Sequence, residues 1–189
     1  MTSSGPTSYS SLSPPRKFDH HGLSLRIIVC GIGCLLLLAP ASSIAVATGK
    51  VDHILILKRK HELRLLSGNE IVRSYSIALG RGGLQPKQRR GDRRTPEGFY
   101  HIDFRNPKSR FHLALHISYP QKADKERARR LGLDPGGDIM IHGLGDEFKS
   151  LGASQHLYDW TDGCIAVTDS EIEEIWRLVP EGTPVEIQP

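Results

Sequence analysis

Apolar side chains between residues 52 and 79 recur at every second position, which is the spacing of a strand with one buried face. Three such runs lie at residues 54–58, 63–65 and 71–79, with turn residues between them at Arg59-Lys60 and Ser67-Gly68-Asn69. The pattern predicts a meander of short strands joined by tight turns.

Residues 80–95 break this alternation with four glycines, Pro86 and many charges, which is typical of a long irregular loop that ends in Pro96-Glu97-Gly98. Strand character resumes at residues 99–104 and again at residues 111–119. In the second run Phe111, Leu113, Leu115 and Ile117 share one face, and His112, Ala114, His116 and Ser118 share the other. We expect the first face to join the core and the second to be free for chemistry.

Two helices are predicted. Residues 123–131 are charged and helix-prone, and Thr168-Asp169-Ser170-Glu171 is a capping-box sequence that should begin a helix running through Trp176. A short apolar strand at residues 138–141 leads into His142, and residues 185–187 close the chain as a strand. The predicted class is mainly β with two short helices, and the chain shows no repeat and no dinucleotide or phosphate-loop glycine pattern.

The amino-terminal part has the composition of an export segment. Residues 1–21 are rich in Ser, Pro and Thr; Arg26, an apolar run at 27–39, Pro40 and Ala45-Val46-Ala47 follow. This order predicts a disordered N-terminus plus a secretory signal over residues 1–47. The apolar run is shorter than the roughly 20 residues that span a bilayer. A membrane anchor through residues 27–47 is therefore the lesser alternative, and so is lipidation at Cys34, because apolar residues follow that cysteine.

Charge argues against nucleic acid as a partner. The whole chain carries +4, but residues 48–189 hold 22 Lys and Arg against 20 Asp and Glu, an evenly mixed surface. Basic side chains do concentrate in one predicted loop, at Lys87, Arg89, Arg90, Arg93 and Arg94. This cluster is either a solvated loop or a contact for an anionic polymer.

Cys164 is the single cysteine downstream of the export segment, so an internal disulfide is excluded for an exported domain. Its thiol is buried and inert, paired between chains, or reactive. A reactive thiol needs a base, and His142 is the best candidate because it ends a strand at a glycine-rich turn. His112 and His116 share a strand face, but no further ligand completes a zinc site, and we expect neither metal nor cofactor.

The motifs around these two residues resemble the L,D-transpeptidase catalytic domain, also called the YkuD domain. The hallmark of that family is a histidine followed at a set distance by Ser or Thr, His, Gly and Cys, and here His142-Gly143 leads to Thr161-Asp162-Gly163-Cys164. Further matching segments run through residues 91–100, 117–120, 136–143 and 182–185, so the resemblance covers residues 51–188. It implies a YkuD-like β-sandwich or barrel.

Residue by residue, the resemblance implies that Cys164 is the nucleophile, His142 the general acid/base, Gly143 the backbone carbonyl that orients it, and Gly163 an oxyanion amide. Thr161, Asp162, His116 and Tyr119 are expected to contact substrate. Three departures stand out: Asp162 replaces the usual histidine, Ala166 replaces a usual Arg or Asn, and the spacer over residues 143–160 is longer than usual, at 18 residues.

The activity implied by the resemblance is cysteine-dependent acyl transfer on peptidoglycan stem peptides. Cys164 would form a thioester that an amine resolves, with no cofactor and no obligate protein partner, in the periplasm or cell envelope. Two alternatives stay open. One is a hydrolase of the same family, either an L,D-carboxypeptidase or an amidase, and the other is a non-catalytic peptidoglycan-binding module in which Asp162 marks lost catalysis.

Overall fold

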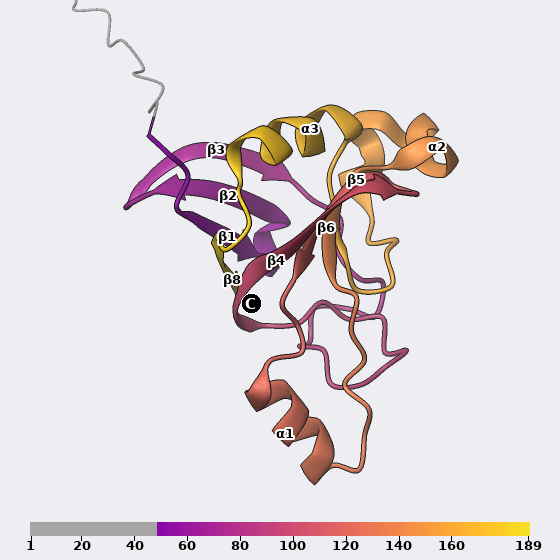
Figure 1. The fold of residues 1–189 in the computed structure, drawn as a ribbon. Helices are drawn as coiled ribbons and strands as arrows, with labels where there is room; N and C mark the ends of the chain where they lie inside the picture. Colours follow the sequence, from indigo (N-terminus) through magenta and orange to yellow (C-terminus); the bar gives the residue numbers. More distant parts are fainter. Residues whose placement is uncertain (1–48) are drawn as a thin grey trace, which may run out of the picture. The chain divides into compact units, whose positions relative to one another are not determined.

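The computed structural model describes residues 49–189, and the export segment predicted over residues 1–47 lies outside them. The described part is built on a mixed sheet of eight strands (Figure 1). The strand order is β3-β2-β1-β8-β4-β5-β6-β7. The strands are β1 (His53–Leu57), β2 (Glu62–Ser67), β3 (Glu70–Ser76), β4 (Gly98–Ser109), β5 (His112–Ile117), β6 (Met140–His142), β7 (Ile165–Ala166) and β8 (Pro184–Gln188).

The predicted meander is confirmed in strands β1 to β3, which pair antiparallel in sequence order. The closing strand β8 then pairs parallel to β1, with Ile54 opposite Val185 and Ile56 opposite Ile187. Ile54 and Ile56 are fully buried, because alternate side chains of these strands enter one core.

The 12 residues of β4 join the two halves of the sheet. Its first residues pair with β8, and the rest pair with β5 through two register shifts. Such irregularities bend a strand, so the halves can close around a shared core. The predicted mainly β class is confirmed.

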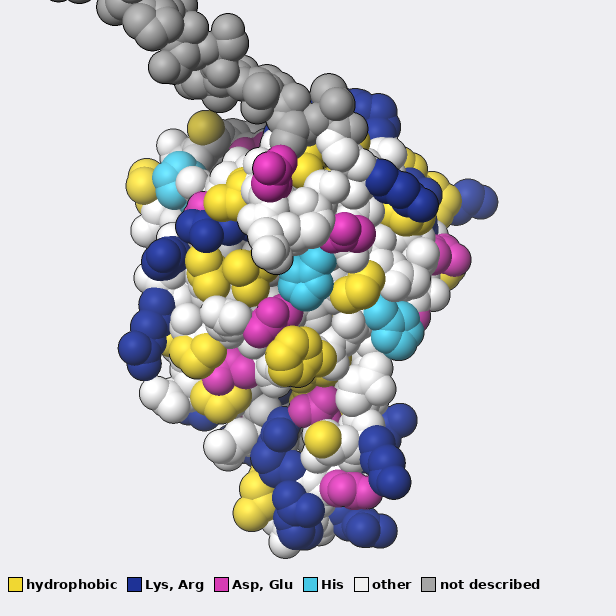
Figure 2. Space-filling view, turned by 90° about the vertical axis from the view of Figure 1, so that its left-hand side faces the viewer, with side chains coloured by type: hydrophobic (Ala, Val, Ile, Leu, Met, Phe, Trp, Pro, Cys, Tyr) yellow, Lys and Arg dark blue, Asp and Glu magenta, His cyan; other side chains and the backbone are white. Residues whose placement is uncertain are grey.

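The two predicted helices are α1 (Lys122–Arg130) and α3 (Asp169–Leu178). The long spacer over residues 143–160 contains a further helix, α2 (Gly145–Phe148), and a 3-10 segment, η2 (Lys149–Leu157). α3 begins as the sequence predicts: the Glu171 amide donates to Thr168 Oγ1 (3.3 Å), and the Thr168 amide donates to Glu171 Oε2 (2.7 Å). Ile172 and Ile175 pack its buried face against the core. α1 lies at the far end of the domain, where Lys and Arg side chains gather (Figure 2).

A buried lysine fixes the long loop over residues 80–97. Lys58 is fully buried in a short 3-10 turn, η1 (Lys58–Lys60). Its ammonium donates to Glu97 Oε1 (2.8 Å) and to the carbonyl oxygens of Thr95 (3.1 Å) and Gln85 (3.4 Å). These bonds satisfy a charge that would otherwise be costly to bury, and they tie the loop to the sheet. Among residues 49–189 no helix is long and apolar enough to cross a membrane.

Candidate active site

His142 ends β6, a strand that pairs with β5 on one side and β7 on the other. It lies opposite Ala114 on β5 and Ala166 on β7. Small neighbours on both sides leave room for the imidazole above the sheet. The side chain is nevertheless almost fully buried, with 2% exposure.

The backbone sets the tautomer of this histidine. Nδ1 lies 2.6 Å from the carbonyl oxygen of Gly143. Because a carbonyl only accepts, Nδ1 must carry the proton, and Nε2 is left as a proton acceptor. The Gly143 carbonyl oxygen thus lies beside the imidazole, where its predicted role of orienting the ring requires it. Burial lowers the pKa of His142 to about 4, which the bond to Gly143 offsets only in part, so the imidazole is neutral at pH 7.

Gly143 has no room for a side chain. A Cβ atom there would lie 2.6 Å from Asp169 Oδ1 and 2.9 Å from Ile172 Cγ2 on α3. Asp169 also accepts hydrogen bonds from the amides of Leu144 (2.7 Å) and Gly145 (3.1 Å). The start of α3 therefore holds the turn that presents the Gly143 carbonyl to His142.

Cys164 lies immediately before β7, and extending the Ile141–Ile165 register back by one residue places it beside Met140. Met140 and His142 are two residues apart, so Cys164 and His142 project from the same face of the sheet, with Cα atoms about 8 Å apart from strand spacing and rise. The Cys164 thiol donates to the carbonyl oxygen of Asp138 (3.5 Å), and burial raises the pKa of Cys164 to about 11. Both partners are therefore uncharged at rest.

A cavity of about 490 Å³ contains both groups. Its walls come from the turn between β4 and β5, from β6, α2 and the segment before Cys164, and from Arg81 of the long loop. The lining residues are Arg81, Arg110, Phe111, His142, Glu147, Phe148, Asp159, Trp160, Thr161, Asp162 and Cys164. This cavity is where a substrate could meet the thiol and the imidazole together.

Three aromatic side chains that the sequence analysis did not assign to the site surround His142. Phe111 stacks on the imidazole, with ring centroids 4.3 Å apart, and Trp160 meets it edge-on at 5.8 Å. Phe148 of α2 packs on Trp160 at 4.4 Å. Trp160 directly precedes the Thr161 motif, which is a signal the sequence offered, whereas Phe148 reaches the site only because the spacer folds into α2.

Thr161 organises the turn that carries the nucleophile. Its hydroxyl donates to the carbonyl oxygen of Cys164 (2.7 Å) and accepts from the Gly163 amide (3.1 Å). An oxyanion could take the Gly163 hydrogen only by displacing this hydroxyl, so the predicted oxyanion role of Gly163 requires the turn to adjust. Gly163 itself has φ +130°, and a Cβ there would lie 2.8 Å from the Arg94 carbonyl oxygen.

Asp162 stands at the rim of the cavity, with its side chain 71% exposed. Its Oδ1 accepts from Arg81 Nη2 (3.0 Å) and lies 3.6 Å from Arg93 Nε. Ala166, another departure from the family pattern, is fully buried and exchanges backbone hydrogen bonds with Ala78. Of these two residues that differ from the family pattern, only Asp162 is exposed to a ligand in the cavity.

Two predicted substrate contacts are not brought to the cavity. The Tyr119 hydroxyl is directed into the protein, where it donates to the Pro135 carbonyl oxygen (2.9 Å), and the residue is 3% exposed. His116 pairs with Asp103, with Nδ1 to Oδ1 at 2.6 Å. In this structure Tyr119 packs in the core and His116 pairs with an acid of the neighbouring strand, so their contact with substrate stays a prediction.

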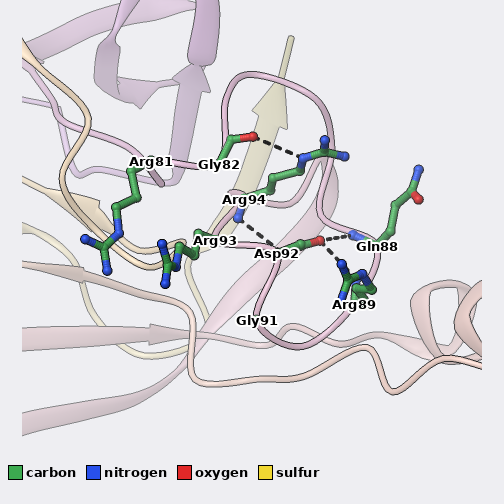
Figure 3. Close-up of a pocket in the computed structure, with 8 residues that line it drawn as sticks. All are labelled: Arg81, Gly82, Gln88, Arg89, Gly91, Asp92, Arg93 and Arg94. Atoms are coloured by element: carbon green, nitrogen blue, oxygen red, sulfur yellow. Dashed lines mark hydrogen bonds between the residues drawn. The ribbon is translucent and has the colours of Figure 1, made fainter.

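The basic loop is partly an internal structure (Figure 3). Lys87 is buried and bonds Asp92 Oδ1 at 2.8 Å, and Asp92 also accepts from the amides of Gln88, Arg89 and Arg94. These contacts lower the pKa of Asp92 to about 2, although burial opposes the shift. Arg90 pairs with Asp134 (2.6 Å). Several of the charges that suggested an anionic polymer therefore stabilise the loop itself.

A thiol and a buried neutral imidazole in one cavity, on a bent mixed sheet, define the class of a cysteine–histidine site. The profile of the YkuD family, described as the L,D-transpeptidase catalytic domain, matches residues 51–187. The chain belongs to this family. The family resemblance read from its motifs is thereby confirmed.

Individual relatives agree with this assignment. YafK of Escherichia coli (strain K12), provisionally named an L,D-transpeptidase, is 35% identical over 113 residues, which are 58% of this chain and 38% of YafK. The helical cell shape determining protein Pgp2 of Campylobacter jejuni superposes with a TM-score of 0.55 at 26% identity, covering 75% of this chain and 48% of Pgp2. An L,D-transpeptidase from Mycobacterium smegmatis shares the fold, with a TM-score of 0.50 at 14% identity and coverage of 74% and 59%. The chain thus spans less than half the length of YafK and of Pgp2.

Proposed function

We propose that this chain is a cysteine acyltransferase of the bacterial cell wall, an L,D-transpeptidase in which Cys164 is the nucleophile and His142 the general acid/base. The observation that carries the proposal is the hydrogen bond from His142 Nδ1 to the Gly143 carbonyl. It leaves Nε2 as an acceptor in the cavity that Cys164 also lines. A general base needs this combination of fixed orientation and a free lone pair.

The charge states support a concerted proton transfer. With a thiol pKa of about 11, forming the thiolate in equilibrium with water at pH 7 would cost about 5 kcal/mol, so a base inside the site is required. As the sulfur leaves Asp138 and attacks the carbonyl carbon, its proton passes to His142 Nε2. The imidazolium then protonates the leaving amine, and a thioester on Cys164 remains.

In the second half of the reaction an amine acceptor attacks the thioester. His142 takes the proton of the amine and returns it to the departing sulfur, which restores the neutral pair. The acyl bond that is broken supplies the energy, so no nucleotide or other cofactor enters the proposal. The amide of Cys164, together with that of Gly163 once it is released from Thr161, would stabilise the oxyanion in both halves.

The proposed substrate is the stem peptide of peptidoglycan, and the proposed location is the periplasm or cell envelope. Family membership supports both, and so does the likeness to a protein named for helical cell shape. The amino-terminal segment with the features of a secretory signal would deliver the domain there, with cleavage or with anchoring through residues 27–47.

A product assay tests this function. Purified protein is incubated with disaccharide tetrapeptide, and the products are compared by mass spectrometry with those of Cys164→Ala. A cross-linked dimer formed only by the intact protein is the expected result. A shortened peptide without dimer would make water the acceptor and the chain a hydrolase, and identical inert profiles would favour a binding module.

A further inference from the structure

Two arginines meet at the rim of the active-site cavity around a single carboxylate. Arg81 donates to Asp162 Oδ1 through both Nε (3.1 Å) and Nη2 (3.0 Å), and Arg93 Nε lies 3.6 Å from the same oxygen. The two arginine side chains are about half exposed, at 48% and 56%. Figure 3 shows that both point to the same side of their loop, away from the turn of Asp92 and Arg89.

The backbone that carries these arginines is locked against the nucleophile's turn. A Cβ on Gly80 would lie 2.3 Å from the Arg93 carbonyl oxygen and 2.9 Å from Gly163 Cα, so only glycine permits this approach. The amide of Arg81 donates to the Thr161 carbonyl (2.9 Å). The backbone positions from which the Arg81 and Arg93 side chains extend are therefore fixed beside the turn that carries Cys164.

The charge at this rim is not balanced. Two guanidinium groups share one carboxylate, which leaves a net positive charge. Two of the other acids nearby are engaged elsewhere: Asp92 holds Lys87 and three loop amides, and Asp159 pairs with His61 at 3.1 Å. Glu147 of α2 also lines the cavity, as does Arg110. Arg81 and Arg93 also border a hollow of about 390 Å³, and Arg81 lines both this hollow and the cavity, so space for an anion exists next to them.

We propose that Arg81 and Arg93, positioned by Asp162, form a specificity site that binds a carboxylate of the stem peptide beside the scissile bond. This inference rests on the proposed function. Asp162 lies two residues before Cys164, which limits their Cα separation to about 7 Å. A carboxylate on the residue that leaves, or on the side chain just before the scissile bond, lies within reach of the arginines while the peptide carbonyl is at the thiol. Arginine suits this task because its planar fork matches a carboxylate.

The test measures binding and turnover in parallel with the full-length chain. Binding uses the Cys164→Ala background, so that no peptide is consumed. The probes are a tetrapeptide with free carboxylates, two peptides amidated either at the terminal or at the side-chain carboxylate, and one amidated at both. The variants are Arg81→Gln, Arg93→Gln and their combination, with Arg129→Gln, an exposed arginine of α1 that lines neither the cavity nor the hollow, as the control.

We expect the double variant to weaken binding of the free tetrapeptide by about ten- to a hundredfold, the range for hydrogen bonds to a charged group. It should change binding of the doubly amidated peptide less than twofold, and Arg129→Gln should leave binding of both peptides unchanged. If amidation of one carboxylate removes the effect of the double variant on binding, that carboxylate is the one that Arg81 and Arg93 bind. Equal weakening of free and amidated peptides, or no weakening of either, would overturn the proposed site.

Turnover by protein with Cys164 intact separates this inference from the function on which it rests. Turnover without arginine-dependent discrimination removes the carboxylate site and leaves the enzyme. Arginine-dependent binding without turnover by the intact protein removes the transpeptidase and leaves a peptide-binding site. Absence of both binding and turnover contradicts both proposals.

Discussion

Protonation of His142 should make this protein sensitive to acid through a single buried group. Burial lowers its pKa from 6.5 to about 4 in the folded protein. The unfolded chain therefore binds a proton more readily, and the stability that the neutral imidazole provides is full above pH 6.5 and lost as the pH falls toward 4. Linkage with these two values gives a loss of about 2 kcal/mol between pH 7 and pH 5, and about 3 kcal/mol by pH 4.

Urea unfolding at pH 7, 6, 5 and 4 measures this loss, with His142→Gln as the reference. The variant removes the titrating group but keeps the titration of the carboxylates, so the difference between the two proteins isolates His142. The free energy of unfolding of the unsubstituted protein should fall by about 2 kcal/mol more than that of the variant between pH 7 and pH 5. Parallel pH dependence of the two proteins would refute the assignment of His142 as a buried, neutral base.

Three further predictions concern the loop, the turn and the thiol. Replacing Lys58 by Met leaves Glu97 without its partner and should reduce the free energy of unfolding by about 3 kcal/mol, measured in urea; unchanged stability would contradict the clamp. Gly143→Ala should lower the free energy of unfolding by about 1–3 kcal/mol through overpacking and should abolish any turnover. Gly137→Ala should be near neutral, because its Cβ would have no neighbour closer than 4.0 Å. Equal effects of the two substitutions would refute the packing argument. Alkylation of Cys164 by iodoacetamide should accelerate with pH past pH 9, because burial raises the thiol pKa; an inflection below pH 7 would instead indicate a preformed thiolate.

Alternation and capping account for most of what the sequence predicted about the fold. Ile54, Ile56, Leu63 and Leu65 are fully buried, as the period of two requires, and α3 begins at its predicted capping box. The third predicted run was too long, because β3 ends at Ser76. Beyond it the chain leaves the strand and forms isolated bridges from Ala78 and Gly80. The partners in these bridges, Ala166 and Thr161, lie more than 80 positions away in the sequence, so a local alternation of apolar residues does not predict them.

The site residues that belong to recognisable sequence motifs could be predicted, whereas those that distant segments bring into the site could not. Cys164 and His142 share the cavity as expected. Phe111 reaches the imidazole, and Phe148 reaches Trp160 beside it, only through tertiary packing. Lys58 falls in the first alternating run, but its partners Thr95 and Glu97 lie 37 and 39 residues away. Tyr119 and His116 lie outside the cavity lining for the converse reason, since a strand pattern predicts a face but not the neighbours of each side chain.

The central claim is that an acyl group passes through Cys164, and intact-protein mass spectrometry after rapid acid quench tests it most directly. The protein is mixed with disaccharide tetrapeptide and stopped at short times. We expect a mass increase equal to the peptide without its terminal residue, mapped by digestion to Cys164 and absent from Cys164→Ala. Turnover by Cys164→Ala at the rate of the unsubstituted protein, or an adduct on any other residue, would contradict it.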